Sequence, residues 1–205
     1  MEFSAETNIK AVLKGLDRVA KDQIPFATSL ALNKAADVVV NDITQGIRTN
    51  LDKPTRFTEL AFKTQSGRFK GIRATKKNLV ARIIPGEAQS TYLKYQVHGG
   101  SRRANRSKIA VPTRNVKLNK FGNVPGRRSG LIKNPNQFAG EIKGIDGIWE
   151  RYGKKKRAIR LLHGFSHSVR YEKRMPLYKI SRDSFAKNFR KIFIESLNYA
   201  MKTAK

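Results

Sequence analysis

The chain has 205 residues, no cysteine, and 43 Lys+Arg against 15 Asp+Glu, a formal net charge of +28 at pH 7. The absence of cysteine excludes disulfides and thiolate metal sites. Because so large a charge attracts anions, the leading partner classes are nucleic acid, an anionic membrane and an acidic protein. No stretch approaches the ~20 apolar residues of a membrane span, and the N-terminus lacks the apolar core of a signal peptide. We therefore expect a soluble chain, made in the cytoplasm and not secreted. Of the three partner classes, we do not expect the membrane.

The first fifty residues predict two helices. Apolar residues recur at three- and four-residue spacing over residues 8–22 and again over 26–50. Pro25 separates the two stretches and suits the first turn of the second helix. This region holds six basic and six acidic side chains. The excess positive charge therefore lies elsewhere in the chain.

The middle of the chain predicts short elements. A turn at Lys53-Pro54 leads into a short helix over 56–62. Strands are predicted over 68–74 and 78–84, the second rich in β-branched residues, with a hairpin turn at Lys76-Lys77-Asn78. Residues 89–97 read either as a short helix or as an irregular aromatic segment.

A basic excursion over about 98–136 follows. From His98 to Lys133 it carries ten Lys or Arg and no acidic residue. Its like charges repel and its glycines are costly to order, so we expect it to project from one edge of the fold and to order only on assembly. Short strands at 108–111 and 116–118 are the elements predicted inside it.

From Gln137 the pattern indicates a β-meander and then a helix. Turn residues separate four candidate strands, and the last helix has one apolar face. The strands are predicted over 137–142, 147–152, 157–162 and 168–171, and the helix over 178–202. The prediction is an α+β fold in a single domain, residues 1–205, with two N-terminal helices and a C-terminal helix packed on an antiparallel sheet.

Residues typical of catalysis are sparse. His163 and His167 are four apart, but they flank a predicted turn and have no third ligand nearby. Asp146 and Glu150 lie near a lysine run, which loosely fits a metal-dependent nuclease, although this spacing is common by chance. No phosphate-binding glycine loop and no nucleophile elbow is present. We therefore expect a binding protein that is not an enzyme and has no metal or cofactor.

The candidate binding residues are basic. Arginine suits planar contacts with phosphate, and without a base-reading motif such contacts would be independent of sequence and sensitive to salt. The candidates are Arg102, Arg103, Arg106, Lys108, Arg127, Arg128, Lys154, Lys155, Lys156 and Arg157. The run from Lys154 to Arg157 also reads as a solvated hairpin tip. Tyr92 and Tyr95 could stack on bases, although anchoring the base of the excursion is the simpler role.

Several segments of the chain together carry a family resemblance. The N-terminal segment is NIKAVLKGLDRVAKDQIPFATSLALNKAADVVVNDI, with a predicted short helix, a proline and an Ala-rich helix that contains the step Ala31-Leu32-Asn33-Lys34. It resembles the start of the minor tail protein Z-like family of bacteriophage tail-completion proteins. YLKYQVHGG resembles the Y-x-x-Y-V-E-x-G element of head-tail joining proteins, with His98 where an acid is usual. Gly147-Ile148-Trp149, a basic hairpin, Met175-Pro176-Leu177 and the terminal helix also fit in order.

The resemblance implies a structural virion protein of a long-tailed phage or prophage. Such a protein would complete the head-proximal end of the tail, at the neck. It would form a homo-oligomeric ring, a hexamer, and contact the tail terminator and head connector proteins. Genomic DNA would pass through the channel without sequence-specific contacts. The alternative is a sequence-independent nucleic-acid-binding protein of other origin.

Overall fold

The computed structural model describes residues 14–15, 17, 19–63, 73–105, 107–125, 130–153, 155 and 157–203. Contacts within the chain divide it into two compact units. The helical unit comprises Met1–Ile47, Thr58–Ser90 and Pro176–Lys205, and the sheet unit comprises Arg48–Phe57 and Thr91–Met175. Helices and antiparallel sheets are both present, which confirms the α+β class. The single domain stays a prediction.

Two long helices dominate the helical unit, and both are predicted by the sequence. The helices of the chain are η1 (Val19–Gln23, a π-helix), α2 (Ile24–Asn50), α3 (Arg56–Glu59), α4 (Glu87–His98) and α5 (Leu177–Lys202). Pro25 lies in the first turn of α2, where its missing N–H costs no hydrogen bond. Of the helix predicted over 8–22, residues 8–13, 16 and 18 lie outside the described part, and its last residues belong to η1.

One row of residues on α2 forms the core of the helical unit. Its members recur every four residues and are at most 3% exposed: Ala27, Ala31, Ala35, Val39, Ile43 and Ile47. Residues four apart on a helix lie on one face, so this row is a continuous apolar ridge. Gly46 is also buried inside the uninterrupted helix.

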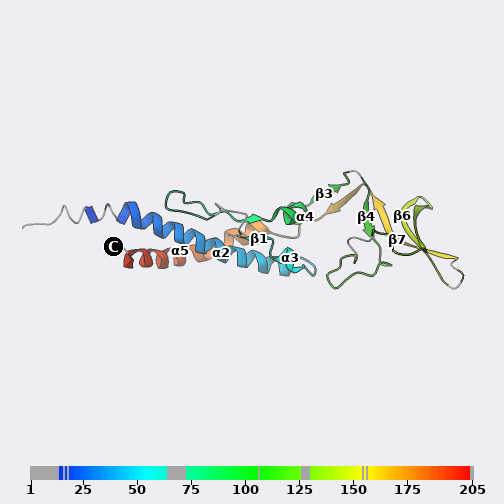
Figure 1. The fold of residues 1–205 in the computed structure, drawn as a ribbon. Coiled ribbons are helices and arrows are strands. Elements are labelled where there is room, and N and C mark those ends of the chain that lie inside the picture. Colours follow the sequence, from blue (N-terminus) through cyan, green and yellow to red (C-terminus); the bar gives the residue numbers. More distant parts are fainter. Residues whose placement is uncertain are drawn as a thin grey trace, which may run out of the picture. The chain divides into compact units, whose positions relative to one another are not determined.

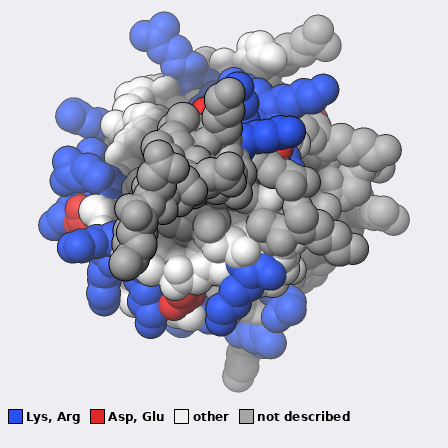
Figure 2. All heavy atoms as spheres, turned by 90° about the vertical axis from the view of Figure 1, so that its left-hand side faces the viewer, with Lys and Arg blue, Asp and Glu red and all other residues white. Residues whose placement is uncertain are grey.

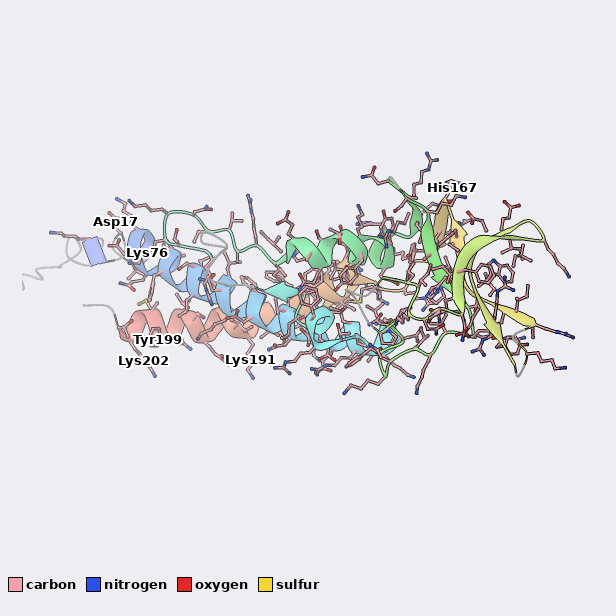
Figure 3. The ribbon with its side chains drawn as sticks, turned by 45° about the vertical axis from the view of Figure 1, so that its right-hand side comes forward. Asp17, Lys76, His167, Lys191, Tyr199 and Lys202 are labelled. Atoms are coloured by element: carbon pink, nitrogen blue, oxygen red, sulfur yellow. The ribbon has the colours of Figure 1, made fainter. Side chains whose placement is uncertain are left out.

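The second long helix, α5, runs antiparallel to α2. The Phe26 ring near the start of α2 lies 6.5 Å from the Tyr199 ring near the end of α5. Figure 1 shows the two helices side by side, and Tyr199 is labelled in Figure 3. Ser196 and Ala200, both fully buried, are the best-protected residues of α5. Small residues at these positions let the helix end pack against its neighbours.

The segment after residue 72 is fastened to α2 by side-chain hydrogen bonds. The Asn33 amide group donates to the Ala74 carbonyl at 3.0 Å and accepts from the Ala74 N–H at 2.8 Å. One turn further along α2, Asp37 Oδ2 lies 3.0 Å from Arg73 Nη2. Asn33 thus forms hydrogen bonds with both backbone groups of Ala74, as a residue of a neighbouring strand would. This gives a structural role to the asparagine of the Ala31–Lys34 step.

Replacing Asn33 by alanine is expected to destabilise the helical unit by about 1–3 kcal/mol, because both backbone groups of Ala74 lose their partner. Thermal unfolding followed by circular dichroism measures the loss. Asn41→Ala, at an exposed position on the same helix, is the matched control and should change stability by less than about 0.5 kcal/mol. Equal losses in the two variants would contradict the role of Asn33.

The sheets also follow the sequence pattern in part. The strands are β1 (Phe62–Lys63), β2 (Ile84–Pro85), β3 (Gly100–Arg103), β4 (Ile109–Pro112), β5 (Gln137–Ile142), β6 (Ile145–Tyr152), β7 (Ala158–Ser166) and β8 (Ser168–Tyr171). In the sheet unit, one antiparallel sheet has the order β4-β7-β6-β5, and β3 pairs with β8 in a second sheet. The bounds of β5 and β8 coincide with the prediction. The long helices belong to the other unit.

Four local predictions are wrong. Residues 78–83 are irregular, and only Ile84–Pro85 pairs, with β1. Residues 116–118 form no strand. The helix predicted over 56–62 ends at Glu59. The strand predicted from Gly147 begins at Ile145, because the tight turn uses Lys143 and Gly144, which both have positive φ.

Two other predictions have a clear outcome. Thr75 and Asn78 exchange backbone hydrogen bonds of 2.8 and 3.1 Å, which confirms the turn at Lys76-Lys77. Its first flanking strand, predicted over 68–74, lies largely outside the described residues. The segment over 89–97 is a helix, α4, with Leu93 and Val97 buried.

Part of the basic excursion forms strands, so its loop portion is shorter than the 98–136 predicted. Its first part, predicted to order only on assembly, already forms β3, which pairs with β8, and β4, which pairs with β7. These partners supply backbone hydrogen bonds that offset the cost of ordering a charged segment. The strand predicted at 108–111 is thus confirmed as β4. Of the described residues that follow β4, 113–125 and 130–136 belong to no strand or helix.

Candidate polyanion interface

The β3–β8 pair forms a short ribbon rich in arginine. The register sets Ser101 opposite Arg170 and Arg103 opposite Ser168. Because side chains alternate across a strand, Arg103 and Arg170 share one face of the ribbon and Arg102 lies on the other. All three arginines are exposed. We call this set, Arg102, Arg103 and Arg170, the arginine ribbon.

The arginine ribbon has uncompensated positive charge. Within the described part of the chain, none of its arginines forms an ion pair with a carboxylate. Guanidinium groups without such partners remain available to phosphate oxygens. A two-stranded ribbon is also narrow enough to enter the major groove of DNA. The arrangement therefore suits contact with a polyanion.

Arg170 is a member that the sequence analysis does not single out. It becomes a candidate only because β8 lies beside β3. The sequence predicts β8 but not β3, whose residues Gly100-Ser101-Arg102-Arg103 show no apolar alternation. The available signal is the predicted strand over 168–171, because an antiparallel partner rich in arginine would draw attention to Arg170.

A second basic group lies at the loop between β6 and β7. Lys155 and Arg157 are exposed there, which confirms the predicted hairpin tip, while Lys154 and Lys156 lie outside the described residues. The arginines of the adjoining strands are engaged within the chain: Arg151 lies over the Phe138 ring at 4.9 Å and Arg160 over the Tyr152 ring at 5.2 Å.

The structure keeps the two basic groups apart. The loop precedes the first residue of β7, whereas the arginine ribbon lies beyond its last residue, near His167, which Figure 3 labels. A strand of nine residues spans roughly 30 Å at ~3.3 Å per residue. A single phosphate therefore cannot contact both groups. A ligand that reaches both must be extended, as a nucleic acid is.

The remaining candidates divide into paired and undescribed residues. Lys108 Nζ lies 2.5 Å from Asp146 Oδ2, so its charge is already compensated. Arg106, Arg127 and Arg128 lie outside the described residues.

Tyr95 of α4 is better explained as a structural residue. The Tyr95 ring is stacked on the Tyr171 ring of β8, with 5.3 Å between centroids. Both rings are half-buried. This contact ties α4 to the arginine ribbon and supports an anchoring role for Tyr95.

The acidic residues considered for a nuclease do not converge. Asp146 pairs with Lys108 and Glu150 with Arg160, at 2.5 and 2.6 Å. Four residues along β6 separate the two carboxylates by roughly 13 Å, too far to share one metal ion. Among the described residues, no group of three His, Cys, Asp or Glu could hold a metal.

Glu150 is the most strongly held carboxylate of the sheet unit. Its side chain is 14% exposed, Arg160 Nε donates to it at 2.7 Å and Gln137 Nε2 at 3.2 Å. The hydrogen bond from Arg160 is the main reason that the pKa of Glu150 lies below its ordinary value of 4.5. A lowered pKa stabilises the fold above that value, and the stabilisation is lost as the pH falls through the folded-state pKa.

Glu150→Gln is therefore expected to lose about 1–3 kcal/mol at pH 7 and to show a weaker decline of stability below pH 4.5 than the wild type. Urea unfolding at pH 7 and pH 3.5 measures both effects. Glu141→Gln, at an exposed carboxylate on the neighbouring strand, is the matched control. An unchanged decline in Glu150→Gln would show that the Arg160 pair is not the source.

No described helix is both long and apolar enough to cross a membrane. In Figure 2, the described side chains around the edge of the face include many lysines and arginines, with few acidic side chains between them. Comparison of the chain with protein-family models, curated proteins and solved structures finds no match.

Proposed function

We propose that this chain is a structural virion protein of a long-tailed phage or prophage, acting by assembly and not by catalysis. It completes the head-proximal end of the tail and joins it to the head connector around the DNA channel. Support comes from the ordered resemblance of its segments to tail-completion proteins. The two long helices, α2 and α5, and the antiparallel hairpins are compatible with that assignment.

The chemical support for the proposal comes from the arginine ribbon. Its three exposed guanidinium groups have no carboxylate partner among the described residues. In a symmetric ring, each subunit presents the same residues to the axis or to the next ring. A hexamer would repeat the ribbon around a channel that holds DNA, or against acidic surfaces of the tail terminator and head connector proteins. Contacts with genomic DNA would be independent of sequence.

The test is a phage or prophage in which the gene is interrupted. We expect heads and tails to assemble, but infectious titre to fall by orders of magnitude, with recovery when the protein is supplied in trans. Electron microscopy should locate the protein at the neck. Joined particles of full infectivity made without it would overturn the proposal.

A sequence-independent nucleic-acid-binding protein of other origin is the second candidate. The same arginine ribbon favours it. Such a protein would bind duplexes of different sequence equally, with a steep salt dependence, but would be absent from purified particles. If the protein is present in virions at a fixed copy number, that result will favour the structural virion protein over this second candidate.

A further inference from the structure

The C-terminal helix α5 presents a row of phenylalanine side chains at the surface of the helical unit. Phe185, Phe189 and Phe193 follow one another at four-residue spacing, so they lie along one side of the helix. The rings of Phe185 and Phe189 are stacked with 4.6 Å between centroids, and the centroids of Phe189 and Phe193 are 6.0 Å apart. We call these three residues the phenylalanine row. They form one continuous aromatic surface.

The helical unit covers the phenylalanine row only in part. Phe185 is 40% exposed, and Phe189 and Phe193 are half-buried. The buried residues of α5 are small ones: Ser184, Ser196 and Ala200. A single exposed apolar side chain is ordinary in a folded protein, whereas a contiguous apolar surface marks a contact with another molecule. The phenylalanine row therefore needs a partner.

A second row on α5 runs beside the first and is exposed to solvent. Its members also recur every four residues: Arg182, Ala186, Arg190 and Ile194. Residues three apart on a helix are neighbours, so the first three members adjoin the phenylalanine row. Rows at four-residue spacing are the ridges that interdigitate when two helices pack. An extended strand on this face would leave backbone polar groups against apolar surface without partners, so the occupant that suits it is a helix.

Charge decides which helix fits. Helix α5 carries six Lys or Arg and two Asp or Glu. Among the described residues, its one ion pair joins the neighbours Arg182 and Asp183 at 3.5 Å, and Arg190 has no carboxylate partner. A second copy of this face would bring like charges together, and the net charge of +28 opposes such pairing further. The partner helix must therefore carry acidic residues beside its apolar stripe.

We propose that this face of α5 is a docking surface for an acidic amphipathic helix of another protein. The apolar stripe of that helix packs on the phenylalanine row, and its carboxylates contact Arg182 and Arg190. Aromatic residues and arginine are the side chains enriched in protein–protein interfaces. The face belongs to the helical unit and the arginine ribbon to the sheet unit. The proposal is thus separate from DNA binding and does not depend on the tail assignment.

The experiment measures the binding of labelled synthetic peptides to the full chain by fluorescence anisotropy. The first probe is an amphipathic helix of about three heptads, with leucine on one face and glutamate beside it. The second probe has lysine in place of each glutamate, and the third has serine in place of each leucine. We expect the first probe to bind at least about tenfold more tightly than either of the others. Equal binding of the first and third probes would overturn the proposal, because charge alone would explain it, and so would the absence of saturable binding of the first probe.

A double variant locates the contact on α5. Phe185→Ser with Ile194→Ser changes two exposed side chains and keeps the two half-buried rings, so the fold should be retained, as circular dichroism would check. The affinity for the first probe should fall at least about tenfold. Leu79→Ser with Val80→Ser, at two exposed apolar positions elsewhere in the helical unit, is the matched control and should leave binding unchanged. No loss in the first double variant, or equal losses in both, would overturn the docking surface.

Sedimentation of the chain without a peptide tests a second copy as the occupant. We expect the wild type and the Phe185→Ser, Ile194→Ser variant to have the same mass in solution at equal concentration. Self-association that the double substitution abolishes would show that this face binds another copy of the chain, and would overturn the acidic partner.

Discussion

Replacing the three arginines of the arginine ribbon by glutamine is expected to weaken binding to duplex DNA about a hundredfold at low salt. Each guanidinium group contributes roughly 1 kcal/mol to a phosphate contact at an exposed site, and 1.4 kcal/mol is a factor of ten. The plot of log affinity against log salt should lose about 0.9 of its slope for each contact removed. Fluorescence anisotropy with a labelled duplex, over a range of salt concentrations, measures both quantities.

The matched control removes the same charge elsewhere. Lys187, Arg190 and Lys191 are exposed on α5, and Lys191 is labelled in Figure 3. Their triple replacement by glutamine lowers net charge as much as the ribbon variant does. If binding depends only on total charge, the two variants will weaken it equally, and the ribbon will have no special role. A larger loss in the ribbon variant locates the contact on β3 and β8.

The sequence predicts elements well where one face is buried. The apolar ridge of α2 and the alternation in β5 and β8 each repeat with the period of the element, so their bounds follow closely. The strand predicted over 78–84 fails because β-branched residues such as Val80 favour an extended backbone but supply no pairing partner. Leu79 and Val80 remain 42% and 47% exposed.

The candidate sites were harder to predict, because they depend on contacts between distant segments. Arg102 and Arg103 stand out by composition, but Arg170 joins them only through the pairing of β3 with β8. His163 reads as a turn residue in the sequence. Its place on the sheet depends on a β-bulge: Trp149 of β6 is opposite Leu161 and Ile148 is opposite His163, so Leu162 is an extra residue in β7. One extra residue in a strand leaves no mark in composition or charge. Periodicity therefore locates elements, while register decides which side chains meet.

Gly147→Ala is expected to destabilise the sheet unit by about 3 kcal/mol. Gly147 lies between Gly140 of β5 and Gly164 of β7. A Cβ atom there would be 2.2 Å from the backbone oxygen of His163 and 2.8 Å from Leu161 Cδ1. No rotamer change can relieve a clash with backbone, so β6 and β7 must separate next to the bulge. The shift would also move His163, which is 3% exposed.

Gly140→Ala tests the same substitution one strand away. Its Cβ would meet only the Phe138 ring, at 3.9 Å, an ordinary contact. We expect stability to change by less than about 0.5 kcal/mol, or to rise slightly because alanine restricts the unfolded chain. The single tryptophan, Trp149, is 8% exposed on β6, so its fluorescence during urea unfolding reports on this sheet. Similar midpoints for the two variants would mean that β6 and β7 have room at Gly147, and that the bulge is not held by close backbone packing.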